Sequence, residues 1–316
     1  MNRRPLPLLL GEYMSFRLLQ FLALALPEHL AVRLGDILGT LAAAAARGRR
    51  RIAEENLLNA FPGMSRERAR RIATGVFRHC VRGTIEVVRG QRVIRPYNLR
   101  RIVTFRNEEV VDRIMESGRP AIWVTAHLGT WELFGMCLSM RKARLTTVYR
   151  PLHNPWLDRL IRRHRTAMGQ RMVERKGALP ALLRVLRRGE SHVALLVDQH
   201  VRHGAVWVPF FGRPAATTPA PALLALRTGA PIVLWYTRRL PGVFRFEAVV
   251  DEPIYVAPGD DPRGEVLRVT ERISRRLEDF IRSAPEQWLW FHRRWRTPPD
   301  GILEEETDVE PSRHAV

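Results

Sequence analysis

The residues best suited to chemistry lie in the segment His127-Leu-Gly-Thr-Trp-Glu132. An apolar, β-branched run precedes His127 and predicts a strand, after which Gly129 permits a tight turn. Thr130 then stands where the N-cap of a helix is expected. The segment therefore predicts a histidine held at the junction between a strand and a helix.

His127 can act as a general base when a neighbouring group fixes its tautomer. Glu132, in the first turn of the predicted helix, is expected to accept a hydrogen bond from one ring N–H and to stabilise the imidazolium. The other ring nitrogen is then left to take a proton from a hydroxyl. No Ser or Cys stands beside His127 as a nucleophile, so the natural chemistry is direct attack by a substrate hydroxyl.

The spacing of histidine and acid is not diagnostic alone, because His153 and Asp158 have the same spacing without the strand–Gly–helix context. It is also not the i, i+4 spacing of a helical zinc pair, so we predict no metal. The two cysteines, Cys80 and Cys137, are too few for a disulfide framework or a four-cysteine zinc site. They favour a reducing compartment.

Polar side chains end three of the predicted strands. His127 follows the first, Arg150 ends the second, and Asp198 with Gln199 ends the third. Ligands of open α/β sheets bind beyond the carboxyl ends of the strands, so three such ends predict one site. A guanidinium suits a phosphate or the oxyanion of a thioester, and we expect Arg150 and Arg165 to hold one of these. The alternative for either residue is a place on a solvated face of an arginine-rich protein, and for Arg165, within Arg162-Arg163-His164-Arg165, that alternative is nearly as good.

From about residue 100, short β-branched runs alternate with helical patterns, which predicts one α/β domain with a largely parallel sheet. A long helix is expected to start at Met64-Ser65. The predicted strands are Ala121–Ala126, Leu145–Arg150, Val193–Asp198, Ile232–Thr237 and Phe244–Val250. The predicted helices are 131–140, 155–168, 179–188, 220–228 and 263–283.

The charge of the chain favours an anionic partner. Its 316 residues include 52 Lys or Arg and 32 Asp or Glu, a net charge of +20. Two basic clusters beside apolar or indole-rich sequence are predicted to bind an anionic membrane surface. Stacking on nucleic acid is the alternative, but no RNA- or DNA-binding signature accompanies the clusters, and it leaves His127 unexplained. The predicted lipid-binding residues are Arg49, Arg50, Arg51, Trp288, Trp290, Arg293, Arg294 and Trp295.

Residues 1–60 are predicted to be helical and apolar. The runs Leu18–Pro27 and Ile37–Ala46 are separated by charged residues, and neither approaches the ~20 residues of a spanning helix. We expect a hairpin that lies against or dips into a membrane, although a helix pair packed on the domain core fits the periodicity equally well. An α/β domain over 61–299 and an acidic, disordered tail over 300–316 complete the expected organisation.

Several ordered blocks resemble one protein family, the bacterial lipid A biosynthesis (lauroyl and myristoyl) acyltransferases. The likeness covers roughly residues 15–298 and includes a C-terminal block rich in Trp and Arg. The blocks are Arg51–Leu57 with Ala60-Phe61-Pro62, His127-x4-Glu132, Tyr149-Arg150-Pro151 with Asn154-Pro155 and Asp158, Asp198-Gln199, Val208–Gly212 with Ala216–Thr218, and Pro285–Thr297.

The resemblance implies a glycerolipid-acyltransferase-like α/β fold with a mixed, mostly parallel sheet flanked by helices. It also implies transfer of a fatty acyl group from acyl carrier protein or coenzyme A to a glycolipid hydroxyl, with no further cofactor. By this resemblance His127 is the base and Glu132 its partner, and Arg165 and Asp198 match further catalytic positions. The substrate-binding candidates are Arg150, Gly129, Trp131 and Gln199.

The resemblance leaves the acceptor and the mode of attachment open. The related phosphatidylinositol mannoside acyltransferases share the His-x-Gly-x-Trp motif, so a lipid A precursor, a phosphatidylinositol mannoside and a lysophospholipid all remain possible acceptors. The family usually begins with a clearer membrane helix than residues 16–27, where Arg17 and Gln20 interrupt the run. We therefore expect peripheral or shallow attachment at the cytoplasmic face of the bacterial inner membrane.

Overall fold

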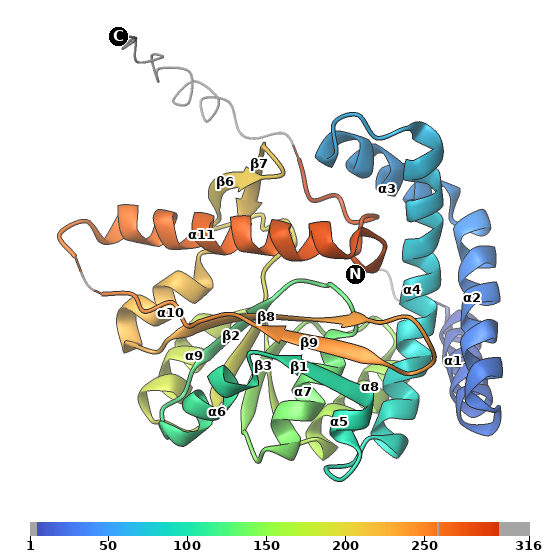
Figure 1. Cartoon of the computed structure of the whole chain (residues 1–316), viewed down its shortest axis with the longest axis horizontal. Coiled ribbons are helices and arrows are strands. Elements are labelled where there is room, and N and C mark those ends of the chain that lie inside the picture. Colours follow the sequence, from blue (N-terminus) through green and yellow to red (C-terminus); the bar gives the residue numbers. More distant parts are fainter. Residues whose placement is uncertain (1–4, 258, 297–316) are drawn as a thin grey trace.

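Four helices open the chain and stand together along one side of the molecule (Figure 1). The computed structural model describes residues 5–257 and 259–296. A short connection joins α1 to α2 as a hairpin, and α3 turns away from α2 by 93°. These helices are α1 (Leu6–Ala25), α2 (Glu28–Ala45), α3 (Arg47–Ala60) and α4 (Arg66–Val93).

The hairpin packs closely on the long helix α4. Gly35 and Gly39 bring the α2 backbone against α4, and a Cβ added at Gly39 would overlap the backbone of Arg78. Helices α3 and α4 also enter the main core, to which they contribute Leu57 and Val76. The N-terminal helices are therefore packed on the α/β part along α4.

Seven strands form the central sheet in the order β1-β9-β8-β2-β5-β3-β4. All neighbouring strands are parallel except β8 and β9, which confirms the predicted mostly parallel sheet. A separate antiparallel hairpin joins β6 to β7. The strands are β1 (Val103–Arg106), β2 (Ile122–Thr125), β3 (Leu145–Tyr149), β4 (Gln170–Glu174), β5 (His192–Leu196), β6 (Val206–Phe210), β7 (Arg213–Thr217), β8 (Ile232–Arg239) and β9 (Phe246–Val250).

Helices cover both faces of this sheet. The cluster that contains Ile122 and Val124 of β2 also takes in residues of α9 (Ala178–Arg187), α10 (Ala220–Thr228) and α11 (Pro262–Ser283). Trp123, between them in sequence, is buried on the opposite face with α6 (Glu108–Glu116) and α7 (Trp131–Met140). Successive strand residues point to opposite faces, so β2 is buried on both sides.

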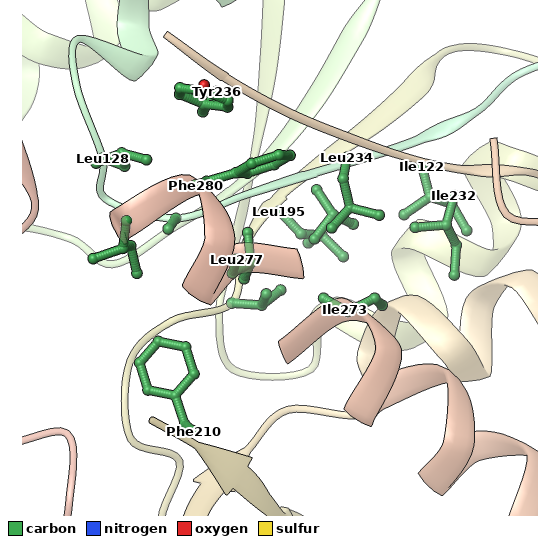
Figure 2. Packing of buried hydrophobic residues seen from close by; sticks show 14 of the residues in the cluster. Ile122, Leu128, Leu195, Phe210, Ile232, Leu234, Tyr236, Ile273, Leu277 and Phe280 are labelled. Carbon is green, nitrogen blue, oxygen red and sulfur yellow. The ribbon is translucent and has the colours of Figure 1, made fainter. Parts of the chain in front are cut away.

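Helix α11 presents an apolar face to the sheet. Ile273, Leu277 and Phe280 lie at helical spacing and point toward sheet residues such as Leu234 (Figure 2). The rings of Phe280 and Tyr236 are 4.4 Å apart. Burying side chains of this size stabilises a fold by about 1.5–3 kcal/mol each, so this helix fixes the strands that lead into the site.

The predicted strands and helices are present, with boundaries shifted by a few residues, and Ser65 caps α4 by accepting the N–H of Arg68. Sequence analysis missed β1, β4, the β6–β7 hairpin, α5 (Leu99–Ile102) and α6. Strands β1 and β4 lie at the two edges of the sheet and contain charged residues, so neither shows the apolar run of a buried strand. The tail expected over 300–316 lies outside the described residues, and the predicted boundary at residue 60 stays a prediction.

Helix α1 differs from the expectation that no segment is long enough to cross a membrane. This helix of 20 residues is long and apolar enough to cross a membrane, judged by length and composition. In its most apolar stretch of 18 residues, 6% of the residues are buried in the fold. The sequence argument counted only uninterrupted apolar runs. In the structure Glu12 and Arg17 lie within one continuous helix that begins at Leu6.

The tight approach of α2 to α4 predicts a strong effect of adding one carbon. Gly39→Ala places a Cβ on the Arg78 backbone and should lower the stability of the folded protein by about 1–3 kcal/mol. Gly11→Ala is the matched control, because no heavy atom lies within 4 Å of its added Cβ. Thermal unfolding in detergent measures both. Equal melting temperatures for the two variants would contradict this packing.

Candidate active site

Two of the predicted site residues meet at the carboxyl edge of neighbouring parallel strands. His127 follows β2 and Asp198 follows β5, and Thr125 of β2 stands opposite Leu196 of β5 in the register. Strands paired in parallel end at the same edge, so both side chains are carried to one place. The structure thus brings His127 and Asp198 into contact.

The Asp198 carboxylate accepts three hydrogen bonds. His127 donates its Nδ1–H to Oδ1 at 2.8 Å and its backbone N–H to Oδ2 at 2.9 Å. Trp288 donates its indole Nε1–H to Oδ2 at 2.7 Å. The histidine therefore carries its proton on Nδ1, since a carboxylate can only accept.

This carboxylate is held ionised. Burial alone would raise the pKa of Asp198, but a positive charge on His127 and the hydrogen bonds from His127 and Trp288 outweigh burial and lower the pKa to about 2. Asp198 therefore keeps its negative charge throughout the neutral range and can stabilise an imidazolium beside it.

The second ring nitrogen of His127 is left available. Nε2 of Gln199 lies 3.5 Å from this nitrogen, too far for a firm hydrogen bond. The His127 side chain is 22% exposed, and the Trp131 ring packs edge-on against it with 5.2 Å between ring centroids. A hydroxyl that enters here can give its proton to Nε2.

Glu132 does not contact His127 in the way predicted. It forms an ion pair with Arg165 of α8 (Pro155–Ala167), and the two side chains are 19% and 23% exposed. The expectation that Glu132 fixes the histidine tautomer is therefore wrong, because Asp198 on the adjacent strand already occupies Nδ1. The prediction followed the nearest acid in sequence and could not see the strand pairing.

Arg150 and Gln199 lie exposed at the same edge of the sheet, at the ends of β3 and β5. Strands β3 and β5 are themselves neighbours, so Arg150 follows the strand beside the one that carries Asp198. In the described part, no carboxylate pairs with Arg150, in contrast to Arg165. The guanidinium of Arg150 is therefore available to an anionic group.

Three of the residues predicted to bind lipid in the C-terminal block are instead buried. Trp288, Trp290 and Arg294 are 1%, 0% and 1% exposed, so the prediction of a membrane-facing indole surface is wrong for them. Trp290 donates its Nε1–H to the carbonyl of Pro285 at 2.6 Å. Arg294 donates to the carbonyl of Ala216 at 2.6 Å, and its guanidinium lies over the ring of Phe210.

The other predicted lipid-binding residues divide into two groups. Trp295 is half-buried, with its Nε1–H donated to the Phe210 carbonyl at 3.0 Å, and Arg50 pairs with Glu54. Exposed side chains are those of Arg49, Arg51 and Arg293, of which Arg51 pairs with Glu55.

The loop after His127 is fixed by backbone contacts that only glycine permits. Gly129 has φ +59°, and a Cβ there would overlap the carbonyl oxygen of Thr237. Its N–H donates to the Gln287 carbonyl at 2.9 Å, and its carbonyl lies 3.1 Å from Nε2 of His79. The tight turn predicted at Gly129 is confirmed.

A buried network of His79, Arg239 and Glu86 holds the carbonyl side of this loop. Arg239 donates to Nδ1 of His79 at 2.9 Å and to both oxygens of Glu86 at 2.6 and 2.5 Å. Burial, followed by the charge of Arg239, lowers the pKa of His79 to about 3, so its ring is neutral. The ring then carries its proton on Nε2 and donates it to the carbonyl of Gly129.

Sequence analysis missed this network and the role of Trp288. Glu86 offered a signal, because it falls beside Ile85 on the apolar face of α4, where a carboxylate needs a buried cation. Thr130 occupies the N-cap position of α7 as expected, but its side chain does not cap the helix. Its hydroxyl instead faces Glu86 at 3.4 Å.

Within residues 5–257 and 259–296, no three His, Cys, Asp or Glu side chains gather in a way that could hold a metal ion. The absence of a metal stays a prediction. The chemistry available from the described side chains is proton transfer through His127 and Asp198, beside the guanidinium groups of Arg150 and Arg165.

The sequence profile of the bacterial lipid A biosynthesis acyltransferases matches residues 8–297, nearly the whole chain. The chain belongs to this family. It is therefore an acyltransferase of glycolipid biosynthesis, as the resemblance implied.

Curated relatives of the family agree over most of their length. The chain is 29% identical to the lipid A biosynthesis lauroyltransferase of Escherichia coli over 284 residues, which cover 89% of this chain and 90% of the relative. It is 25% identical to a lipid A biosynthesis acyltransferase of Haemophilus influenzae, over 90% of this chain and 86% of the relative. A phosphatidylinositol mannoside acyltransferase of Mycobacterium tuberculosis is 26% identical over 58% of this chain and 57% of that protein.

The lowered pKa of Asp198 predicts acid sensitivity. A folded-state pKa of about 2, below the ordinary value of 3.8 for an aspartate, stabilises the protein at pH values above about 4, and this contribution disappears as pH falls toward 2. It amounts to about 2 kcal/mol. Asp198→Asn should flatten the dependence of unfolding free energy on pH in this window, whereas the exposed-site control Glu116→Gln should not. Parallel curves for Asp198→Asn and wild type would contradict it.

Proposed function

We propose that this acyltransferase moves a fatty acyl chain from an acyl thioester to a hydroxyl of a lipid A-like glycolipid, with His127 as general base and Asp198 as its partner. The observation that carries the mechanism is the Nδ1–carboxylate hydrogen bond, which leaves Nε2 accessible at the edge of the sheet. Family membership supports the acyl transfer and the glycolipid acceptor.

The reaction follows from this arrangement in two proton transfers. His127 Nε2 takes the proton of the acceptor hydroxyl as its oxygen attacks the thioester carbonyl, and Asp198 stabilises the resulting imidazolium. The new C–O bond forms, the C–S bond of the tetrahedral intermediate breaks, and the imidazolium returns the proton to the departing thiolate. The products are the acylated glycolipid and a free thiol, without a covalent acyl-enzyme.

Charge on the intermediate requires a donor at the same edge. We assign Arg150 to bind a phosphate or the developing oxyanion, since its guanidinium has no carboxylate partner in the described part. We assign Glu132 and Arg165 to the support of this region as an ion pair. Trp131 and Gln199 lie beside His127 and are assigned to substrate binding. Gly129 was expected to join them, but it is buried and its N–H and carbonyl are already bonded, so we assign it to the support of the turn.

The thioester donor in this proposal is acyl carrier protein or coenzyme A carrying the acyl chain, and no cofactor takes part. The acceptor class rests on the family and on relatives named for lipid A biosynthesis. A phosphatidylinositol mannoside is the second candidate acceptor, because a mycobacterial relative named for that activity matches over 58% of this chain.

We further propose that α1 and α2 hold the enzyme at the cytoplasmic face of the inner membrane by shallow insertion. Exposed apolar side chains of α1 include Leu10, Leu18 and Phe21, at 43%, 59% and 65% exposure. Both ends of α1 are nevertheless bonded to the rest of the protein, through Asn154 to the Leu9 carbonyl and through Arg89 to carbonyls at the C-terminal end. Such contacts favour a helix that lies in the membrane surface.

The proposed roles of Asp198 and Glu132 predict how strongly each substitution lowers kcat. His127→Ala should lower kcat by ~10²–10⁴-fold, the usual loss for a general base, and Asp198→Asn by a similar factor because Asn cannot stabilise the imidazolium. Glu132→Gln should lower kcat less, since its carboxylate pairs with Arg165 instead of the base. Steady-state rates with acyl thioester and glycolipid measure all three.

Circular dichroism and vesicle binding provide the controls for these variants, which should fold and bind like wild type. Wild-type turnover by His127→Ala would exclude it as the base. A larger loss of kcat for Glu132→Gln than for Asp198→Asn would assign the partner role to Glu132.

Membrane attachment through the exposed apolar face predicts a selective loss of binding. The triple variant Leu10→Gln, Leu18→Gln and Phe21→Gln should detach from anionic vesicles at physiological salt, because each substitution removes buried apolar area from the bilayer. Three exposed apolar residues elsewhere give the matched control, Val243→Gln, Tyr255→Gln and Leu267→Gln. Sedimentation with vesicles measures the bound fraction.

The same assay separates membrane from nucleic acid as the anionic partner. Excess single-stranded RNA should leave vesicle binding at physiological salt unchanged. Displacement by RNA, together with no lipid acylation in the same preparation, would overturn the membrane assignment.

A further inference from the structure

The two basic segments recognised in the sequence meet in one pocket. A cavity of about 830 Å³ opens between the bend from α2 to α3 and the C-terminal block. Four arginines line it, Arg47 and Arg49 from the start of α3 and Arg293 and Arg296 from the other end of the chain. Residues nearly 250 positions apart thus bring four arginines to the lining of one space.

These four arginines differ from their neighbours in having no carboxylate partner among the described residues. Arg49 makes only a long contact of 3.4 Å to the Phe291 carbonyl. By contrast, Arg50 and Arg51 pair with acids one turn away on α3. The pocket therefore concentrates positive charge that the described part of the fold does not neutralise, which favours an anion with several oxygens.

The first turn of α3 adds a second feature of an anion site. This helix has 14 residues, and Ala46 at its N-cap offers no side chain to accept the free N–H groups. Gly48 lies in that turn, and a Cβ there would meet nothing within 4 Å. The positive end of the helix dipole thus opens into the same space as the arginines.

Buried hydrogen bonds fix the pocket next to the active site. Asn56 donates to the carbonyls of Trp290 and His292 at 2.7 and 2.9 Å, which ties α3 to the C-terminal block. His292 also lines the pocket, and its Nε2 accepts the backbone N–H of His200 at 3.1 Å, two residues beyond Asp198. Burial lowers the pKa of His292 to about 4, so the positive charge of the pocket comes from its arginines.

The apolar surface of α2 leads to the pocket. Leu30, Ile37 and Leu41 are exposed at spacings of seven and four residues, so they share one face of the helix. Ala45, one turn further, lines the pocket itself. An amphiphile with its acyl chains in the membrane beside α2 would therefore present its headgroup to the pocket at the C-terminal end of this helix.

We propose that the pocket formed by Arg47, Arg49, Arg293 and Arg296 binds a phosphate group of the membrane-embedded glycolipid acceptor and so directs its hydroxyl toward His127. This inference rests on the proposed function, because it assigns a specificity site to the acceptor of that reaction. It gives the unpaired arginines one ligand class, a phosphate monoester on an amphiphile.

The test removes two of the four charges, one from each segment. Arg47→Gln with Arg293→Gln should raise the KM for a phosphorylated glycolipid acceptor about tenfold or more, with kcat and the KM for the acyl thioester little changed. With the same acceptor after phosphatase treatment, this variant and wild type should give equal rates. Arg66→Gln with Arg70→Gln is the control, since both arginines are exposed on α4 and the net charge changes equally.

Other sources of phosphate give different results. A rise in the thioester KM alone would assign the pocket to the donor. A loss of vesicle binding with an unchanged acceptor KM for the bound enzyme would assign it to bulk lipid headgroups. Kinetics equal to those of the control pair would exclude a phosphate site.

A binding measurement keeps this inference separate from the acyl transfer. In the His127→Ala background, equilibrium binding of radiolabelled phosphorylated glycolipid in uncharged detergent micelles should weaken about tenfold on adding Arg47→Gln and Arg293→Gln. That result with a wild-type protein that transfers no acyl group would keep the pocket and reject the proposed function. Unchanged binding would reject the pocket whatever the activity.

Discussion

The hydrogen bond between His127 and Asp198 depends on two parallel strands ending side by side, and the site is arranged around that constraint. Asp198 fixes both the ring and the backbone of His127, so the histidine has one tautomer and one orientation. The same carboxylate also accepts the indole N–H of Trp288, at the oxygen that accepts the backbone N–H of His127. The register of β2 and β5 is thus the structural basis of the proposed proton transfer.

The C-terminal block and the N-terminal helices converge on the same loop from opposite ends of the sequence. The Gly129 N–H donates to the carbonyl of Gln287, and His79 of α4 donates to the carbonyl of Gly129. Burial, followed by the charge of Arg239, lowers the pKa of His79 and keeps its ring neutral, and Arg239, itself held by Glu86, orients the ring. A buried ion pair of this kind is better understood as fixing one geometry than as a source of net stability.

Sequence patterns predicted the parts of this protein that are local or periodic. The strand, glycine and helix around His127 follow from short-range rules, and the long strands of the sheet follow from β-branched runs. The choice between Glu132 and Asp198 was beyond such rules, since it depends on which strands become neighbours across 71 residues. Trp288 and Arg294 show the same limit, because their block is rich in Trp and Arg, as sequences at a membrane surface are, and yet these two side chains are buried.

The dependence of the site on Trp288 has a consequence for the order in which the chain is synthesised. Translation delivers the apolar hairpin of α1 and α2 first, His127 near the middle, and the donor to Asp198 only at residue 288 of 316. The apolar helices therefore leave the ribosome well before the third donor to Asp198 has been synthesised. The arrangement of His127 and Asp198 described above is complete only once Trp288 has followed, so a nascent chain that contains all the strands of the sheet still lacks one of the groups that hold the carboxylate.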